Sequence, residues 1–253
     1  MTDASMPPVV SRQEWSDLVD ALRVREKAHT REGDAIAAVR RRLPMIEVDP
    51  STPVIGAGGS VPLIDVFENR TQLFATYHMW HDGKPAAEQC EGCTFFTGQV
   101  RELSYLHQRD VTFAVFCQGP FEESDRYRRF MGWDMPWYSV PATSYEPLVA
   151  DRHFGMKVCY LRDGDRVFET YWTTGRGCEA MTPAYHMLDM TVYGRQETWE
   201  DSPAGWPQQY ETGAGLQFRK DGRPTAQWAR LAAGYDDDLH TTGSGAGGSG
   251  CCP

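Results

Sequence analysis

The chain has 253 residues, of which 41% are hydrophobic and 24% charged, a composition typical of a globular protein with a large core. Its formal net charge of −10 repels phosphate backbones, so we expect no nucleic-acid partner. No apolar run approaches the length of a membrane span, and residues 1–15 contain no basic segment followed by an apolar one. We therefore expect no membrane contact and a cytoplasmic location.

The first predicted element is a long helix over residues 11–43. Trp15, Leu18 and Leu22 recur there at three- and four-residue steps, as apolar residues do on one face of a helix. A proline directly after this range ends the helix. The apolar segment that follows, residues 45–67, predicts strands and turns that lead into a core.

The next elements alternate between strand and helix. Residues 71–80 alternate in polarity and are rich in β-forming residues, which predicts a buried strand. A loop with Cys90 and Cys93 follows, and apolar residues at helical spacing over 94–110 predict a helix that begins at this cysteine pair. Residues 111–118 predict a second buried strand.

Beyond this strand the pattern predicts an amphipathic helix over residues 121–133 and a short strand over 135–140. Residues 153–172 then predict two strands joined by the turn Arg-Asp-Gly-Asp at 162–165, which is a strong hairpin signal. This succession of strands and helices, closed by a hairpin, predicts a mixed α/β sheet with helices on both faces.

Residues 180–215 are rich in aromatic residues and turns, and we interpret them as a cap over the domain. The last residues have the Gly/Ser composition of a linker, which has no means of packing. We divide the chain into an N-terminal helical extension (1–45), a core domain with its aromatic-rich cap (46–215), a C-terminal segment (216–240) and a flexible tail that ends in Cys-Cys (241–253).

The sequence has seven cysteines, an odd and unevenly spaced set, which argues against a framework of structural disulfides. Cys117 and Cys159 lie in apolar, strand-like runs, so we interpret both as small buried hydrophobic residues. The pattern around Cys178 favours no single role. The remaining cysteines form two pairs, Cys90 with Cys93 and Cys251 with Cys252.

Cys90 and Cys93 carry the chemistry that the sequence predicts. At the start of a helix, unpaired N–H groups and the helix dipole stabilise a thiolate and lower its pKa. Cys90, nearer to the loop, would attack a disulfide, and Cys93, one turn into the helix, would resolve the mixed disulfide. A Cys-x-x-Cys pattern that follows a strand in an α/β chain is typical of a redox dithiol.

Several segments between residues 20 and 210 match a known family in their order and wording: REKAHTREGDAIAAVRRRLP, LFATYHMW, EQCEGCTFF, RRFMGWDMPWYS, FETYWTTGRG, YHMLD and YGR. Through them the chain resembles the bacterial thioredoxin-like family labelled domain of unknown function 899, also described as peroxiredoxin-like. The resemblance implies a thioredoxin-like fold. It does not define an activity, because one fold carries many reactions.

One departure from the wider thioredoxin pattern lies just before the predicted hairpin. Redox proteins of that fold have a cis-proline there, against the dithiol, whereas residues 153–159 read His-Phe-Gly-Met-Lys-Val-Cys. The missing proline weakens disulfide exchange and favours a metal site. By analogy with copper-handling proteins of the fold, we predict a copper site with Cys90, Cys93 and His153 as ligands and His78 as a further candidate.

The histidines also have plainer interpretations. His78 lies on a predicted strand, where a core hydrogen bond is the simpler role. His81 fits a solvated loop residue, and Met79 beside Trp80 fits packing better than metal ligation.

Arg176 and Tyr171 are further catalytic candidates in the segment after the hairpin. An arginine flanked by glycines can bind a substrate carboxylate or a developing anion, or it can hold the cap by pairing with Asp189. The tryptophans suggest a ring-lined cap, either as plain core or as a pocket for a small aromatic substrate: Trp133, Trp137, Trp172, Trp199 and Trp206.

The Cys251–Cys252 pair sits on a flexible arm that could bring it to a dithiol or deliver a soft metal, since a tether raises the effective concentration. Two uninvolved thiols on a disordered end are the alternative.

Three functions stay open. The first, which we favour, is an oxidoreductase that uses the Cys90/Cys93 pair as a copper–thiolate site or as a redox dithiol, with a small molecule, such as a small aromatic compound, or a thiol reductant as its partner. The second is a copper carrier without turnover. The third is a redox-inert module that binds a ligand in the aromatic cap.

Overall fold

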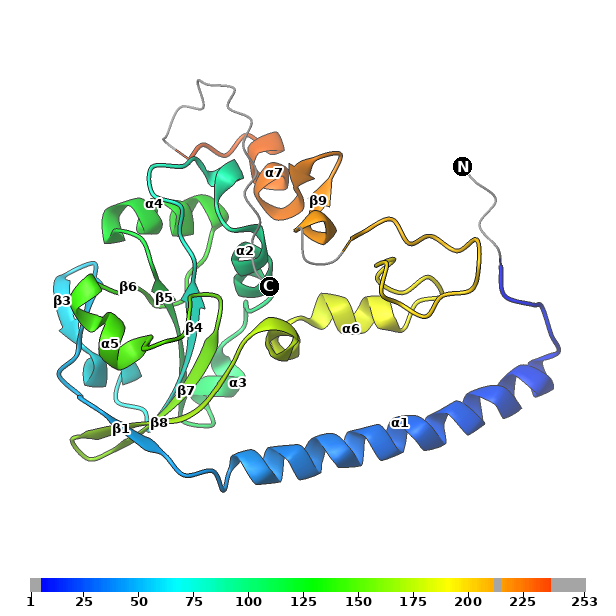
Figure 1. The fold of residues 1–253 in the computed structure, drawn as a ribbon, viewed down its shortest axis with the longest axis horizontal. Coiled ribbons are helices and arrows are strands. Elements are labelled where there is room, and N and C mark those ends of the chain that lie inside the picture. The colour runs from blue at the N-terminus through cyan, green and yellow to red at the C-terminus, as the bar shows by residue number, and fades with distance from the viewer. Residues whose placement is uncertain (1–5, 212–214, 238–253) are drawn as a thin grey trace.

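The computed structural model describes residues 6–211 and 215–237. Its centre is a mixed sheet whose described strands follow the order β1-β8-β7-β4-β5-β6-β2-β3 (Figure 1). The strands of this sheet are β1 (Ile46–Val48), β2 (Pro53–Gly56), β3 (Gly59–Pro62), β4 (Gln72–His78), β5 (Val111–Cys117), β6 (Trp137–Ser139), β7 (Lys157–Asp163) and β8 (Arg166–Thr173). A separate small hairpin joins β9 (Arg219–Lys220) and β10 (Arg223–Pro224).

Four central strands define the class of fold. β4 and β5 are parallel, with His78 at the end of β4 opposite Cys117 at the end of β5. β7 pairs antiparallel with β4, and a tight turn at Gly164 joins it to β8. The order β8-β7-β4-β5, with helix in the crossover from β4 to β5, is the thioredoxin-like arrangement, so the predicted fold class is confirmed.

Side chains of β4 and β5 alternate between the two faces of the sheet and so build two cores. Tyr77 and Phe116 lie in the first core, which the short helices η1 and α5 cover. Phe113 and Val115 lie in the second, where Tyr127 of α4 packs. The described helices are α1 (Arg12–Arg40), α2 (Glu91–Gly98), α3 (Ser104–His107), α4 (Phe121–Met131), α5 (Tyr145–Leu148), α6 (Pro183–Asp189), α7 (Thr225–Ala232) and the 3-10 helices η1 (Leu63–Phe67), η2 (Ala86–Glu88), η3 (Ala142–Ser144), η4 (Gly175–Met181) and η5 (Leu216–Phe218).

None of the helices in the described ranges is long and apolar enough to cross a membrane.

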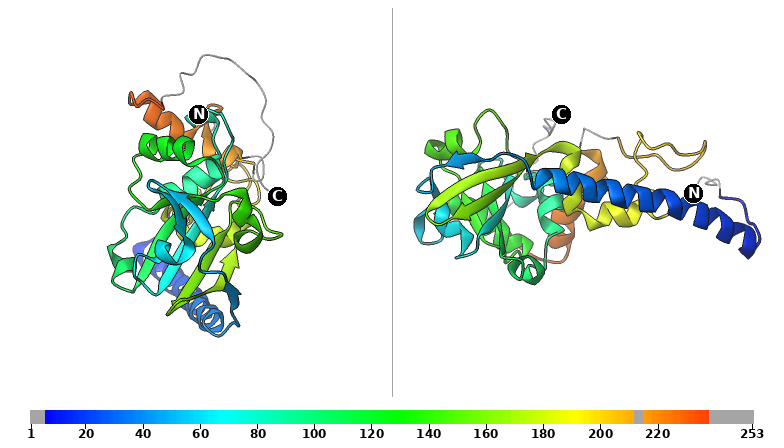
Figure 2. Two further views of the ribbon diagram at one scale, coloured as in Figure 1. Left: turned by 90° about the vertical axis from the view of Figure 1, so that its left-hand side faces the viewer. Right: turned by 90° about the horizontal axis from the view of Figure 1, so that it is seen from below.

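The long N-terminal helix α1 follows the predicted range closely. Ser11 caps it by accepting a hydrogen bond from the Glu14 N–H at 3.2 Å. The helix runs without a break through Gly33 and has no buried residue. Figures 1 and 2 show α1 extending away from the sheet along one side of the molecule.

The helix after the cysteine pair is shorter than predicted. It ends at Gly98, and a separate turn of helix, α3, begins at Ser104. The apolar residues Val100, Leu103 and Leu106 still pack against the second core. Their spacing therefore reflects contact with one face of the sheet, and the prediction of a single helix over 94–110 is wrong.

Candidate functional site at the start of helix α2

The two cysteines lie where the chain leaves β4 and begins α2. Cys90 is the N-cap residue of α2, and its Sγ accepts a hydrogen bond from the Cys93 N–H at 3.4 Å. The Sγ of Cys93 accepts one from the Met79 N–H, also at 3.4 Å, at the end of β4. Backbone donors that point at a sulfur favour its thiolate form, as does the positive end of a helix. The predicted position of Cys90 and Cys93 at a helix start is thus observed.

Both thiols are almost closed off from solvent. The exposed fractions are 2% for Cys90 and 5% for Cys93. The C-terminal segment packs beside them: a Cβ added to Gly92, between the two cysteines, would lie 3.3 Å from the ring of Phe218. The site is therefore closed to solvent in this structure.

Specific polar contacts hold this C-terminal segment in place. Arg219 forms hydrogen bonds of 2.6–3.0 Å with the Glu91 carboxylate at the first residue of α2. Gln227 of α7 donates from Nε2 to the Gln89 carbonyl at 3.2 Å, just before Cys90. These contacts join the C-terminal segment to the residues on both sides of Cys90.

A buried lysine lies beside the site. Lys157, at the start of β7, is only 2% exposed. Its Nζ donates to Thr76 Oγ1 at 2.6 Å and to the Gly155 carbonyl at 3.5 Å, and it lies 5.4 Å from the centre of the Phe96 ring. A buried ammonium group favours anions nearby, because the interior screens charge poorly.

A third thiol joins this group from η4. The Sγ of Cys178, which is 2% exposed, donates to the Gly155 carbonyl at 3.5 Å. Burial raises the pKa of Cys178, the charge of Lys157 opposes that rise, and Cys93 adds to it. Cys93, Cys178 and Lys157 are therefore close enough to influence one another's charge. No local pattern of residues points to Lys157 or Cys178, because β7 and η4 bring them together only in the folded chain.

The turn before β7 lies where redox proteins of the thioredoxin fold have a cis-proline, which this sequence lacks. Among the described residues every peptide bond is trans. The Gly155 N–H donates to the Tyr77 carbonyl at 2.7 Å, and the Tyr77 N–H donates to the Met156 carbonyl at 2.9 Å. Gly155 has a φ of +102°, and a Cβ there would lie 3.8 Å from Met79 Sδ. Glycine thus brings this turn close to the end of β4.

His78 is part of the core. Its Nδ1 lies 3.3 Å from Thr97 Oγ1, and its ring packs against those of Trp133 and Trp137. Burial lowers the pKa of His78 to about 3, with further lowering by Lys157. The imidazole is neutral at neutral pH, which agrees with the prediction of a core hydrogen bond.

The residues predicted as copper ligands are not brought together. His153 is exposed in the turn before β7, whereas Cys90 and Cys93 are buried. Within residues 6–211 and 215–237, no three His, Cys, Asp or Glu side chains are grouped so that they could hold a metal ion. The donor set does not fit the predicted copper site, and copper stays a prediction from the sequence.

The other predicted catalytic residues, Arg176 and Tyr171, lie in η4 and on β8. Arg176 is exposed, pairs with Glu179 at 3.0 Å and stacks over the Trp199 ring at 4.2 Å. Tyr171 is half-buried on β8, with Arg40 of α1 4.9 Å from its ring centre. Both remain predictions as catalytic residues.

The proposed pairing of Arg176 with Asp189 is wrong. Asp189 accepts two hydrogen bonds of 2.7 Å from Arg195 instead. Arg195 also pairs with Glu179 at 3.1 Å and lies over the Tyr185 ring. The hydrogen bond to Asp189 raises the pKa of Arg195. Arg195 therefore joins α6 to η4, the structural role that the sequence left open for Arg176.

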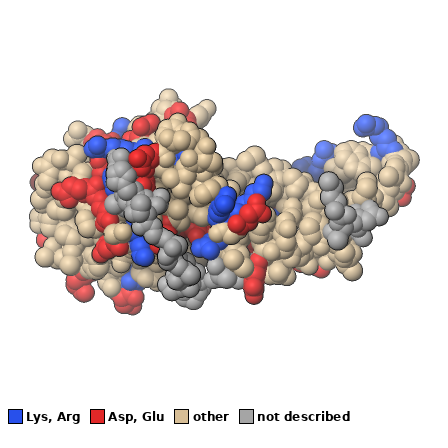
Figure 3. All heavy atoms as spheres, turned by 90° about the horizontal axis from the view of Figure 1, so that it is seen from above, with Lys and Arg blue, Asp and Glu red and all other residues tan. Residues whose placement is uncertain are grey.

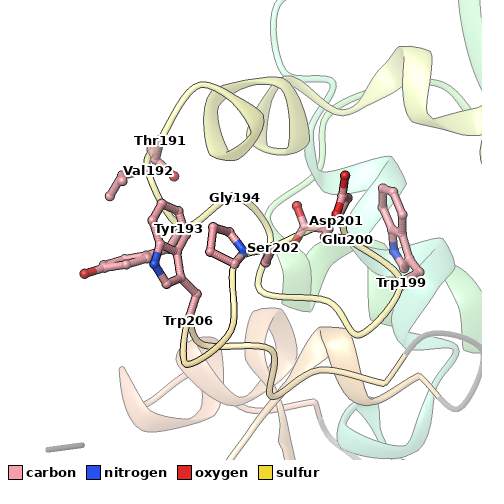
Figure 4. Close-up of a pocket in the computed structure, with 10 residues that line it drawn as sticks. Thr191, Val192, Tyr193, Gly194, Trp199, Glu200, Asp201, Ser202 and Trp206 are labelled. Carbon is pink, nitrogen blue, oxygen red and sulfur yellow. The ribbon is translucent and has the colours of Figure 1, made fainter. Parts of the chain in front are cut away.

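The tryptophans do not form one cap. Trp133 and Trp137 belong to the core, while Trp172 and Trp199 are exposed. A cavity of about 290 Å³ lies in the segment after α6 (Figure 4). On the face shown in Figure 3, acidic and basic side chains are interspersed over the wider part of the molecule. The lining of the cavity consists of Thr191, Val192, Tyr193, Gly194, Trp199, Glu200, Asp201, Ser202, Pro203 and Trp206. The lining includes neither Cys90 nor Cys93.

The remaining cysteines divide as follows. Cys117 is fully buried, and burial raises its pKa to about 12, so it stays a thiol as predicted. Cys159 is half-buried, less than predicted, and burial raises its pKa to about 11. Cys251 and Cys252, with the rest of the predicted tail, lie outside the described residues.

A thioredoxin-type sheet, with a Cys-x-x-Cys pair where a helix follows the central strand, defines a thioredoxin-fold protein. The family model described as "Bacterial protein of unknown function (DUF899)" matches residues 4–230, and the chain belongs to this family. No curated protein matches the sequence.

Two solved structures are similar to parts of the chain. One is a candidate electron transfer protein from Aquifex aeolicus VF5, with 12% identity and a TM-score of 0.34, covering 51% of this chain and 86% of its own. The other is a cysteine-to-serine mutant of the peroxiredoxin 6 of Arenicola marina, with 14% identity and a TM-score of 0.35, covering 58% of this chain and 74% of its own.

Proposed function

We propose that this protein is a thiol–disulfide oxidoreductase in which Cys90 and Cys93 alternate between dithiol and disulfide. The observation that carries the proposal is the position of the two sulfurs at the start of α2, where each accepts a backbone N–H at 3.4 Å. These donors and the helix end stabilise a thiolate, which is the species that exchanges with disulfides.

In the proposed reaction the Cys90 thiolate attacks one sulfur of a small disulfide. A mixed disulfide forms, and the other half of the substrate leaves as a thiolate. Cys93 then attacks the Cys90 sulfur, which releases the second half as a thiolate and leaves a Cys90–Cys93 disulfide. The two released thiolates take up two protons. A dithiol reductant restores the protein by the reverse exchange.

The burial of Cys90 limits the size of the substrate that can reach it. Because Cys90 is 2% exposed, a disulfide on a folded protein cannot approach it in this closed form. We therefore propose a small-molecule disulfide as substrate, admitted when the segment around Phe218 moves. The predicted aromatic substrate is not part of this proposal, since the ring-lined cavity is built from residues 191–206 alone.

The experiment is a redox titration of the full chain in glutathione buffers, with trapping of thiols by alkylation and mass spectrometry. We expect a Cys90–Cys93 disulfide with a reduction potential between roughly −270 and −120 mV, the range of thioredoxin-fold oxidoreductases. Cys159→Ser, on β7, is the matched control and leaves the titration unchanged. Failure of the pair to oxidise in any buffer would overturn the proposal.

Metal analysis of the same purified protein tests the copper prediction separately. Copper at one ion per chain that disappears on Cys90→Ser would replace the dithiol with a metal–thiolate site. Copper that persists in Cys90→Ser would place the metal elsewhere.

A further inference from the structure

We infer that the cavity after α6 is a binding site for a small organic cation, that is, a protonated amine or a quaternary ammonium compound. Its volume of about 290 Å³ lies just below the roughly 300–1,000 Å³ typical of sites for drug-sized ligands, so the ligand is small. The lining comes from residues 191–206 and includes neither cysteine of the redox pair. The inference therefore concerns a second site and does not rest on the redox function.

Aromatic rings form much of the wall of this cavity. Tyr193 and Trp206 lie edge to face, with their ring centres 5.4 Å apart and their planes at 84°. Figure 4 shows the two carboxylates of the lining between this pair and the ring of Trp199. The face of an aromatic ring attracts a cation within about 6 Å of its centre, and Trp does so most strongly. The Trp199 ring already makes such a contact, because the guanidinium of Arg176 lies 4.2 Å from its centre.

The charged groups of the lining are acidic. Glu200 and Asp201 supply two carboxylates, and none of the described residues in the lining is a lysine or an arginine. Two arginines near Trp199 are both paired with Glu179 of η4, Arg176 at 3.0 Å and Arg195 at 3.1 Å. Their charge is thus partly offset outside the cavity. The carboxylates of the lining favour a positively charged ligand and disfavour an anion.

The backbone holds the Glu200 carboxylate in place. Its Oε1 accepts a hydrogen bond from the Arg195 N–H at 3.1 Å, and its Oε2 accepts one from the Glu197 N–H at 2.9 Å. Gly194, with a φ of +58°, makes this arrangement possible, because a Cβ there would clash with Oε1. Gln208 donates from Nε2 to the Glu200 carbonyl at 2.6 Å. A carboxylate that is fixed before the ligand arrives loses less conformational entropy on binding.

Isothermal titration calorimetry of the full chain tests the inference, with choline as the probe and neohexyl alcohol as its uncharged isostere. The two molecules have the same shape, and only choline carries a positive charge. We expect choline to bind at least about tenfold more tightly than neohexyl alcohol. Its affinity should fall about fivefold or more in Trp206→Leu and in Asp201→Asn, because each substitution removes a group that attracts the cation.

Trp15→Leu and Asp34→Asn are the matched controls. Both residues are exposed on α1, outside the cavity, so both variants should bind choline like the native protein. Circular dichroism checks that each variant is folded, and Asp201→Asn, a conservative change of an exposed residue, tests the site even if Trp206→Leu unfolds the segment.

Three outcomes overturn the inference: no binding at roughly 10 mM choline, equal affinities for choline and neohexyl alcohol, or unchanged choline affinity in both cavity variants. Equal affinities would define an aromatic pocket that does not select charge. None of these substitutions touches Cys90 or Cys93, so the redox proposal is judged separately.

Discussion

Burial decides what the individual side chains around the cysteine pair can do. His78 and Lys157 bear ionisable groups on neighbouring strands, at exposed fractions of 0% and 2%. Burial lowers the pKa of the imidazole to about 3, whereas the ammonium group is held by Thr76 and by the Gly155 carbonyl. A base for catalysis at neutral pH is therefore not supplied by His78.

The first prediction concerns the pH dependence of stability. The pKa of His78 falls to about 3 in the folded chain, below its ordinary value of 6.5. Between these values the unfolded chain binds a proton that the folded chain does not, so acid favours unfolding. We expect His78→Gln to flatten the loss of unfolding free energy between pH 6.5 and 4 by about 1.4 kcal/mol per pH unit.

Urea unfolding of native and variant protein across this range measures the effect. His107→Gln is the comparison, because His107 is a half-buried histidine on α3, away from β4. Equal slopes for the native protein and His78→Gln would mean that His78 is protonated in the folded state.

A second prediction tests the support of Lys157. Thr76→Val keeps the shape of the side chain and removes the oxygen that accepts from Nζ at 2.6 Å. Loss of one partner of a buried charged group costs roughly 1–3 kcal/mol, so we expect the unfolding free energy to fall by that amount. In Lys157→Met, where no charge needs a partner, the same Thr76→Val change should cost less. Additive losses in the double variant would argue against this pairing.

At the scale of elements, the C-terminal segment from η5 to α7 packs against the start of α2. Its contacts with the site come from residues far away in the chain, such as the pair of Arg219 with Glu91. This ion pair is partly exposed to solvent, so it adds little to stability. The C-terminal segment can therefore detach from α2 at a small cost in free energy.

The third prediction follows from that contact. Arg219→Ala removes about 1 kcal/mol from the closed form, so we expect the alkylation rate of Cys90 by iodoacetamide to rise about fivefold. Peptide mass spectrometry measures the rate at each cysteine. Arg223→Ala, on strand β10, removes a stacking contact with Trp228 of α7; it serves as the control and leaves the rate unchanged. If Arg223→Ala raised the rate equally, general loosening of the segment would explain both results.

For the whole molecule, a thioredoxin-type sheet carries the site at one end of its central strands, while α1 leaves the body from β1 at one edge of the sheet (Figure 1). The sheet and its two cores contain most of the large buried side chains among the described residues. The body and helix α1 should therefore differ in their contribution to stability.

The fourth prediction uses this division. Because α1 buries no residue, deletion of residues 1–43 should shift the melting temperature by less than about 3 °C when compared at low protein concentration. Differential scanning calorimetry measures the shift. A fall of more than about 8 °C at low concentration would show that α1 packs on its own body.

The sequence by itself determined the local elements and the start of the site. β4, β5, the β7–β8 hairpin and the position of Cys90 at a helix start follow from periodicity, turn residues and helix-cap chemistry, all of which act over a few residues. The predicted helix after Cys93 was too long, because apolar residues that contact one face of the sheet have the same spacing as those on one face of a helix.

Only the tertiary structure decided what surrounds the two sulfurs. Lys157 meets Thr76 across 81 positions of sequence, and Arg219 meets Glu91 across 128. Likewise Arg195, and not Arg176, binds Asp189, and His153 remains apart from the thiols it was predicted to join. Such contacts depend on how strands pair and segments fold back over one another, which no local pattern of residues encodes.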